Sequence, residues 1–386
     1  MIRKLMIKCL KFGLQFNVYG AVLTMLLFVL PVMLSSCGRS TSADSAGAGA
    51  AKESFVDEAR AAILGADAAM GDWNGSWQVS GGGDSGPLVA QVIALGKGQP
   101  AGAGAGQYRA NFLEAFDTRT APLGVLDGKR EADAVSFTGR AKYENSAFDV
   151  KAAIKGDKLT GTFEGPDASG TFSLEHVFRV SPKMGAKPPK GAIVLFNGKD
   201  FKEWKTADKK EGEDQVKWEL VDKAMRVKPG AGSITTKKQF TDVSLHIEFR
   251  SPFMPDARGQ GRGNSGVYLQ GRYEVQVLDS YGLEGLDNEC GGIYTVKAPL
   301  VNMCAPPNQW QTYDITFSAP RFDSAGKMVS NPTLTVLHNG VLIQDKTEAK
   351  GPTTAALGGK ATEPGPLYLQ DHGNAVEYRN IWLIER

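Results

Sequence analysis

Short runs of β-prone residues, separated by glycine-marked turns, fill this chain from Ser76 to its C-terminus and constrain its fold more than any other feature. In AFDVKAAIKGDKLTGTFEG, Gly156 and Asp157 separate two alternating runs, which is a typical hairpin signal. The 46 glycines and 18 phenylalanines fit this pattern, and long helical periodicities are few. Because 386 residues exceed one typical domain, we predict an all-β protein of two domains.

Residues 1–36 have the features of an export signal and are set apart from the fold. Four basic residues precede an apolar run from Ala21 to Leu34, which is shorter than the roughly 20 residues that span a bilayer. The run ends in Leu-Ser-Ser before Cys37, the pattern of a lipobox. We expect Cys37 to be acylated, which makes the protein an exported lipoprotein anchored in a membrane by lipid. The protein would lie at the periplasmic or cell-surface face of that membrane, and we expect the outer membrane. An uncleaved N-terminal anchor is the alternative.

Charge and cysteine content exclude some functions. The signal carries four positive charges and no negative ones, so the formal charge of +2 becomes −2 in the mature chain. No basic patch remains to indicate nucleic-acid binding. Cys290 and Cys304 are the two cysteines left for the exported body, and we expect them to form a disulfide in an oxidising compartment.

Composition shifts divide the mature chain into four segments. Residues 37–52 are rich in Ser, Ala and Gly and are expected to form a flexible tether. An amphipathic helix is predicted from about Glu53 to Met70, and it opens a small antiparallel β-barrel or sandwich domain over 53–180. Residues 181–190 form a Pro-rich linker. The strands of 191–386 suit a two-sheet jelly roll of lectin type, with a groove on one sheet.

One strand of the second domain carries two long polar side chains on a single face. In YEVQVLDS, Glu274 and Gln276 alternate with two valines, so they project together from one side of the strand. Asp279 is out of phase with them unless a bulge or the strand's end re-aims it. The pattern predicts a wet polar groove, although a solvent-exposed polar face fits this segment equally well.

A second polar cluster strengthens the groove interpretation. LYLQDHG ends a strand with Gln370, Asp371 and His372, and the final strand adds Arg379. His372 is the best candidate for proton chemistry, since its neighbours are hydrogen-bonding residues and histidine titrates near neutral pH. Ordinary structural roles are expected for the other three histidines, His176, His246 and His338.

The second half of the chain resembles the 3-keto-glycoside lyase/hydrolase domain family. LFNGKDFKEWK, NSGVYLQG, YEVQVLDS, QWQTYDITF and LYLQDHG followed by EYRNIW match its blocks in order over about 195 residues. The resemblance implies a concanavalin A-like β-sandwich. It does not extend to the first domain or to Cys290 and Cys304.

The resemblance also implies a reaction and a set of roles. A ketone at C3 of a glucoside acidifies the C2 proton, so a base can remove it, the C1 substituent can leave, and water can add to the enone. Glu274 or His372 would be the base, with Asp279 as a third catalytic candidate. Asn264, Gln276, Gln370, Asp371 and Arg379 would bind the oxidised glycoside or oligosaccharide. A divalent metal held by Glu274 and His372 is possible under this interpretation.

Two other functions fit the same fold. A glucanase would present E-x-D-x-x-E on one strand, but the aligned positions here are Glu274, Gln276 and Asp279, so the middle carboxylate is missing. A noncatalytic carbohydrate-binding protein is the second alternative, because a fold alone implies no activity.

Overall fold

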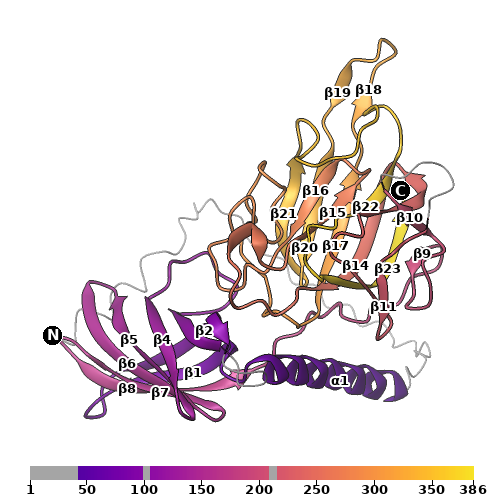
Figure 1. The fold of residues 1–386 in the computed structure, drawn as a ribbon. Helices are drawn as coiled ribbons and strands as arrows, with labels where there is room; N and C mark the ends of the chain where they lie inside the picture. Colours follow the sequence, from indigo (N-terminus) through magenta and orange to yellow (C-terminus); the bar gives the residue numbers. More distant parts are fainter. Residues whose placement is uncertain (1–41, 99–104, 208–214) are drawn as a thin grey trace, which may run out of the picture. The chain divides into compact units, whose positions relative to one another are not determined.

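The computed structural model describes residues 42–98, 105–207 and 215–386. The predicted signal and Cys37 lie outside these residues. No helix of the described part is long and apolar enough to cross a membrane. Residues 48–386 form one compact unit, and the described residues are all-β apart from one long helix and a short 3-10 turn (Figure 1).

The long helix, α1, spans Ser42–Ala66. It therefore starts within the segment predicted as a tether and ends before Met70. Alanine is abundant between Ser42 and Lys52 and has the highest helix propensity of all residues, which accounts for the earlier start. Ala59 and Ile63 of α1 are buried, as the predicted amphipathic pattern requires.

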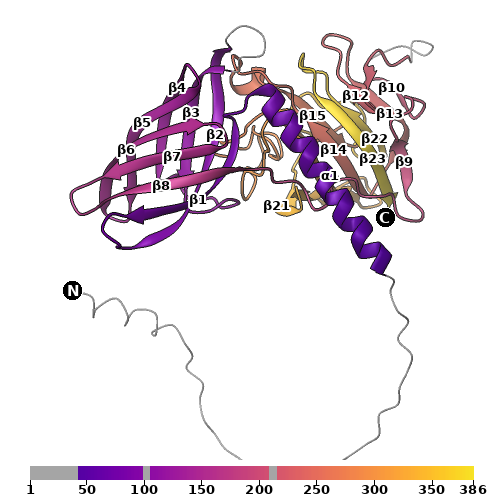
Figure 2. The same cartoon turned by 90° about the horizontal axis from the view of Figure 1, so that it is seen from below.

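The first domain is a closed antiparallel barrel in which each strand pairs with the next and the last pairs with the first (Figure 2). Its strands are β1 (Gly71–Val79), β2 (Ser85–Gly98), β3 (Ala105–Leu113), β4 (Gly124–Glu131), β5 (Ala134–Tyr143), β6 (Ser146–Lys155), β7 (Lys158–Glu164) and β8 (Ser169–Val177). Alternate residues face inward, and large side chains such as Trp73, Phe112 and Phe137 fill the interior. The lumen is thus a packed core and leaves the outer surface for binding.

The second domain contains two large sheets. The five-stranded sheet has the order β10 (Trp204–Thr206), β13 (Ile234–Phe240), β22 (Gly365–Leu369), β15 (Ser265–Leu269) and β16 (Tyr273–Val277). The eight-stranded sheet has the order β11 (Glu219–Val221), β12 (Ala224–Arg226), β23 (Glu377–Glu385), β14 (Val243–Arg250), β17 (Gln311–Ser318), β20 (Thr333–His338) and β21 (Val341–Glu348), with β9 (Ile193–Phe196) also paired to β23. A separate hairpin joins β18 (Arg321–Phe322) and β19 (Met328–Ser330).

One hydrophobic core joins these two sheets into a β-sandwich. Val267 and Leu269 of the five-stranded sheet belong to the same buried cluster as Ile247, Phe249 and Ile381 of the eight-stranded sheet. Because strand residues alternate, Tyr268, which lies between Val267 and Leu269, faces away from this core. Glu274 and Gln276 lie on this outer face of the five-stranded sheet.

The predicted disulfide is not formed. Cys290 and Cys304 are buried free thiols. The Cys290 thiol contacts the Tyr313 hydroxyl at 3.1 Å, and the Cys304 thiol donates to the carbonyl of Leu278. Each sulfur therefore has a polar partner inside the core without a covalent bond, and the irregular stretch between the two cysteines is held by packing.

Candidate functional site

A row of polar and aromatic side chains runs across the outer face of the five-stranded sheet. Tyr268 of β15 lies directly opposite Glu274 of β16, and Gly266 lies opposite Gln276. On the other side of β15, Tyr268 pairs with Tyr368 of β22. Directly opposite residues share a face, so strand register brings these side chains together as the sequence predicted for Glu274 and Gln276.

Glu274 is the chemically distinctive member of this row. Its side chain is buried, with 2% exposed. Burial raises its pKa to about 8, and a hydrogen bond with Tyr268 opposes that shift only in part. The Tyr268 hydroxyl donates to the Thr354 carbonyl at 3.1 Å and accepts from Gln370 Nε2 at 3.2 Å. A carboxyl group with a pKa near neutrality is suited to general base catalysis.

Gly266 makes the space that the carboxyl group occupies. A Cβ at this position would overlap Glu274 Oε1 and would lie 2.7 Å from Cε2 of Tyr268. Those distances are shorter than any side chain tolerates. The glycine of NSGVYLQG thus places the Glu274 carboxyl over the strand beside it.

Amide side chains continue the row beyond Glu274. Gln260, on the 3-10 turn Gly259–Gly261, accepts hydrogen bonds through Oε1 from Asn264 at 3.0 Å and from Gln276 at 3.1 Å. Asn264 is 1% exposed, and its Oδ1 has no partner among the described residues. An unsatisfied buried acceptor is costly, so this oxygen is a natural point for a ligand hydroxyl to bind.

Gln370, Asp371 and His372 were predicted to form one polar cluster, but the turn after β22 separates them. Gln370 lies in the polar row through its bond to Tyr268. Asp371 instead holds the turn and a neighbouring loop, because its carboxylate accepts the backbone N–H of Gly373 and of Gly232, each at 2.9 Å. His372 is exposed at the tip of this turn. Of the three, only Gln370 contacts the Glu274 cluster directly.

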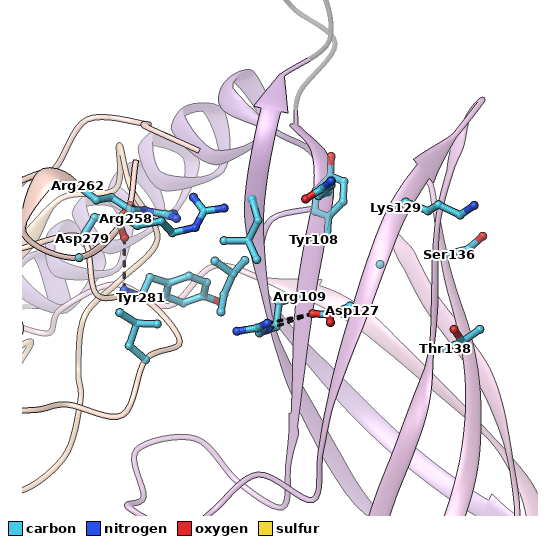
Figure 3. Close-up of a pocket in the computed structure, with 16 residues that line it drawn as sticks. Tyr108, Arg109, Asp127, Lys129, Ser136, Thr138, Arg258, Arg262, Asp279 and Tyr281 are labelled. Carbon is cyan, nitrogen blue, oxygen red and sulfur yellow. Dashed lines mark hydrogen bonds and ion pairs between the residues drawn. The ribbon is translucent and has the colours of Figure 1, made fainter. Parts of the chain in front are cut away.

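Asp279 does not join Glu274. It follows β16 and forms a buried ion pair with Arg262, with 2.6 Å between Oδ2 and Nε (Figure 3). Its backbone N–H also bonds the Arg262 carbonyl, so the two segments are tied together at main chain and side chain. A carboxylate committed to a buried arginine is poorly placed as the acid of a glucanase pair.

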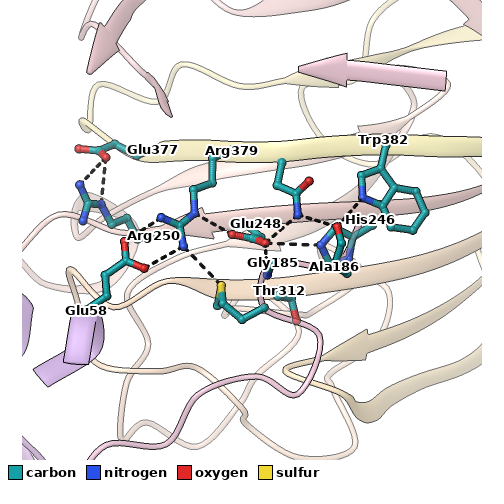
Figure 4. A network of polar contacts seen from close by, with 12 residues as sticks. Glu58, Gly185, Ala186, His246, Glu248, Arg250, Thr312, Glu377, Arg379 and Trp382 are labelled. Atoms are coloured by element: carbon teal, nitrogen blue, oxygen red, sulfur yellow. Dashed lines mark hydrogen bonds and ion pairs between the residues drawn. The ribbon is translucent and has the colours of Figure 1, made fainter. Parts of the chain in front are cut away.

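Arg379 lies on the other sheet and is no neighbour of Glu274. Its guanidinium contacts Glu248 of β14 at 2.7 Å and Glu58 of α1 at 2.7 Å (Figure 4). It also lies over the ring of Trp310. Glu248 is 1% exposed and also accepts from Gly185 and Asn380. The predicted substrate-binding role of Arg379 is thus replaced by a structural one.

The donor set around Glu274 does not fit a conventional metal site. The described residues hold no group of three or more His, Cys, Asp or Glu side chains that could bind a metal ion. Around Glu274 the neighbours are a tyrosine and amides rather than further carboxylates or imidazoles. The proposed reaction therefore uses only side chains of this chain.

Three members of the row were not predicted from the sequence: Gly266, Tyr268 and Gln260. Gly266 and Tyr268 are in the segment NSGVYLQG, whose alternation with Asn264 placed all three on one face. That signal was present and could have been used. Gln260 lies in a loop, where no periodicity indicates direction.

The other three histidines have the structural roles expected of them. His246 and His338 are fully buried and bond Asp314 and Gln311. His176 stacks on Trp73 with ring centroids 4.4 Å apart.

Comparisons with known proteins find a family that matches the second half of the chain. The family described as the 3-keto-alpha-glucoside-1,2-lyase-like domain matches residues 191–384. A solved structure of a candidate glycosyl hydrolase from Parabacteroides distasonis is 38% identical, covering 51% of this chain and 85% of that one, with a TM-score of 0.47. Another candidate glycosyl hydrolase from the same organism is 21% identical, covering 51% and 94%, with a TM-score of 0.37. A search of the curated proteins gives no match.

Proposed function

Since the chain belongs, through residues 191–384, to the family of 3-keto-alpha-glucoside-1,2-lyase-like domains, we propose that it cleaves 3-keto-glycosides by elimination followed by hydration. The observation that carries this proposal is the buried Glu274 carboxyl, whose pKa of about 8 suits a base working near neutral pH. The finer fold that we propose for the sandwich is the concanavalin A-like jelly roll.

In the proposed first step, Glu274 takes the proton from C2 of the sugar. The C2–H electron pair becomes the enolate of the C3 ketone, and the enolate expels the C1 substituent as the C1–O bond breaks. The second N–H of the Gln370 amide, and the Tyr268 hydroxyl once it releases the Thr354 carbonyl, supply hydrogen-bond donors where negative charge develops. His372, exposed at the adjacent turn, is our candidate for protonating the leaving group.

In the second step, water adds across the C1–C2 double bond and the free 3-keto sugar forms. Glu274 returns its proton to C2, the water oxygen bonds to C1, and the proton that the water loses goes to His372, so the Glu274 carboxylate and the acid are both regenerated. Asn264 and Gln276 are proposed to orient the sugar hydroxyls, with the unpartnered Asn264 Oδ1 as an acceptor. Because Glu274 is buried, the segment that carries Thr354 must move for the sugar to enter.

The rival mechanism, that of a retaining glucanase, needs a second free carboxyl group about 5 Å from the first. Gln276 replaces the middle carboxylate, and Asp279 is held in an ion pair with Arg262. A noncatalytic carbohydrate-binding protein is the other alternative, and an activity measurement distinguishes it from an enzyme.

The purified soluble form should be incubated with a 3-keto-glucoside and, separately, with its unoxidised parent. We expect cleavage of the ketone alone, with kcat lowered at least about a hundredfold by Glu274→Gln. Cleavage of the parent would support a glucanase, and binding without cleavage would support a carbohydrate-binding protein. Full activity of both Glu274→Gln and His372→Ala would refute the proposed roles.

We also propose export as a lipoprotein acylated at Cys37, on the basis of the lipobox alone. Labelled palmitate should be incorporated into the wild-type protein and not into Cys37→Ser. Equal labelling of the two would disprove acylation at this residue.

A further inference from the structure

A cavity of about 630 Å³ lies along the outer face of barrel strands β2 to β5, bounded on its other side by Arg258–Arg262 and by the segment after β16 (Figure 3). This volume falls in the range of small-molecule sites. The cavity is separate from the polar row, because none of the Glu274, Tyr268 and Gln370 side chains lines it. Nothing in the proposed cleavage reaction uses it.

The lining of the cavity is positively charged on balance. Four basic side chains line it against two carboxylates, Asp127 and Asp279; the basic ones are Arg109, Lys129, Arg258 and Arg262. Arg109 contacts Asp127 at 3.1 Å, and Arg262 contacts Asp279 at 2.6 Å. Arg258 donates its side-chain hydrogen bonds to the backbone carbonyls of Pro255 and Ala257. Its charge is therefore available to an anion.

Arg262 carries the more specific signal. Its side chain is 5% exposed, yet Nη2 has no hydrogen-bond partner among the described residues. Its Nε is bound to Asp279, and Nη1 reaches the Ala94 carbonyl only at 3.5 Å. A charged donor that is buried without a hydrogen-bond partner destabilises the fold. A ligand oxygen in the cavity would remove that destabilisation.

The rest of the lining has the character of a sugar site. Ser136, Thr138 and Gln107 present hydroxyl and amide groups from the barrel. Ile93 and Tyr281 add an apolar wall, against which the C–H face of a sugar ring can pack. A bare inorganic anion would leave this wall and these neutral polar groups unused.

We propose that this cavity binds a carboxylate-bearing saccharide, with a uronate carboxylate accepting hydrogen bonds from Arg262 and Arg258. The sugar hydroxyls meet Ser136, Thr138 and Gln107, and the ring lies against Ile93 and Tyr281. The 3-10 turn connects this site to the polar row, because Gly259 lines the cavity while Gln260 bonds Asn264 and Gln276. An acidic glycan would thus be held beside the cleavage site.

Titration calorimetry of the full soluble chain tests this proposal, with digalacturonate as the probe and with neutral galactobiose and inorganic phosphate as comparisons. We expect digalacturonate to bind at least tenfold more tightly than either comparison. Arg258→Gln should weaken that binding at least tenfold, and the exposed side chain makes this variant safe for folding. Arg140→Gln is the matched control, because Arg140 is an exposed barrel arginine outside the cavity.

Three results would overturn the proposal: no binding of digalacturonate, equal binding of phosphate, or binding that Arg258→Gln leaves unchanged. Cleavage of the 3-keto-glucoside is measured on the same samples. Arg258→Gln should retain that cleavage, so loss of acidic-saccharide binding and failure of the proposed reaction are separate outcomes.

Discussion

At position 266 the missing side chain leaves room for the carboxyl group of the proposed base. We expect Gly266→Ala to displace Glu274 and to lower kcat/KM for a 3-keto-glucoside at least about a hundredfold, since small misplacements of a catalytic group carry such costs. Gly261→Ala is the control, because a Cβ there meets no atom within 4 Å. Steady-state kinetics of the two variants, with circular dichroism to verify folding, provides the measurement. Equal activity in both would place catalysis elsewhere.

Glu274 also makes stability depend on pH. Its pKa rises from an ordinary 4.5 to about 8 on folding, so the native state holds the proton more tightly. That contribution is fully present below the unfolded pKa and is lost as pH rises through the folded pKa. Relative to Glu274→Gln, wild-type stability should fall by up to about 1.4 kcal/mol per pH unit in this window. Urea unfolding of both proteins below, within and above the window measures this, and parallel curves would contradict it.

The site residues divide according to how local their signals are. Alternation within one strand was enough to place Glu274 and Gln276 on one face, because that rule needs no knowledge of the fold. Arg379 was correctly placed on the final strand, but its distance from Glu274 could not be predicted, since its partner Glu248 lies 131 residues away and neither segment indicates that β14 pairs with β23. Asp279 was correctly seen as out of phase, but its partner Arg262 had no local signal.

At the scale of elements, Glu248 joins β14, β23 and the segment after the barrel through a single buried carboxylate. Replacing it leaves the half-buried Arg379 and a backbone N–H without their buried partner, whereas Glu58 is 38% exposed and its pairing with Arg379 is screened by water. We expect Glu248→Ala to lower the free energy of unfolding by about 3 kcal/mol or more and Glu58→Ala by about 1 kcal/mol or less. Chemical denaturation of both variants measures the difference. Similar losses would show that burial does not govern this network.

Most strands were predictable, because turn glycines and alternation mark them individually. Helix α1 was harder, since alanine and glycine together resemble a tether although the alanines favour a helix. From their composition, residues 181–190 were predicted to form a semi-rigid linker. In the structure this stretch is docked: Ser181 bonds Thr312 at 2.7 Å, and Gly185 bonds Glu248. These contacts are long-range, so no local pattern could reveal them.

For the whole molecule, the question is how the barrel and the sandwich depend on each other. Ile93 is a barrel residue, yet it belongs to the buried cluster of the sandwich. The Tyr281 hydroxyl after β16 donates to Asp72 of the barrel at 2.7 Å, and Asn111 of β3 donates to the Gly282 carbonyl. Such contacts should make the two parts unfold together.

We therefore expect the wild-type soluble chain to unfold in one cooperative thermal transition, and Ile93→Asp to split it into two. A charge placed at this position, which packs into the buried cluster of the sandwich, costs several kcal/mol, and separating the barrel from the sandwich relieves that cost. Val125→Asp is the matched control, because Val125 lies on the barrel with 49% of its surface exposed. Calorimetry gives the number of transitions, and proteolysis at residues 181–190 reports separation independently. A single transition for Ile93→Asp, with those residues still protected, would mean that Ile93 does not couple the two parts.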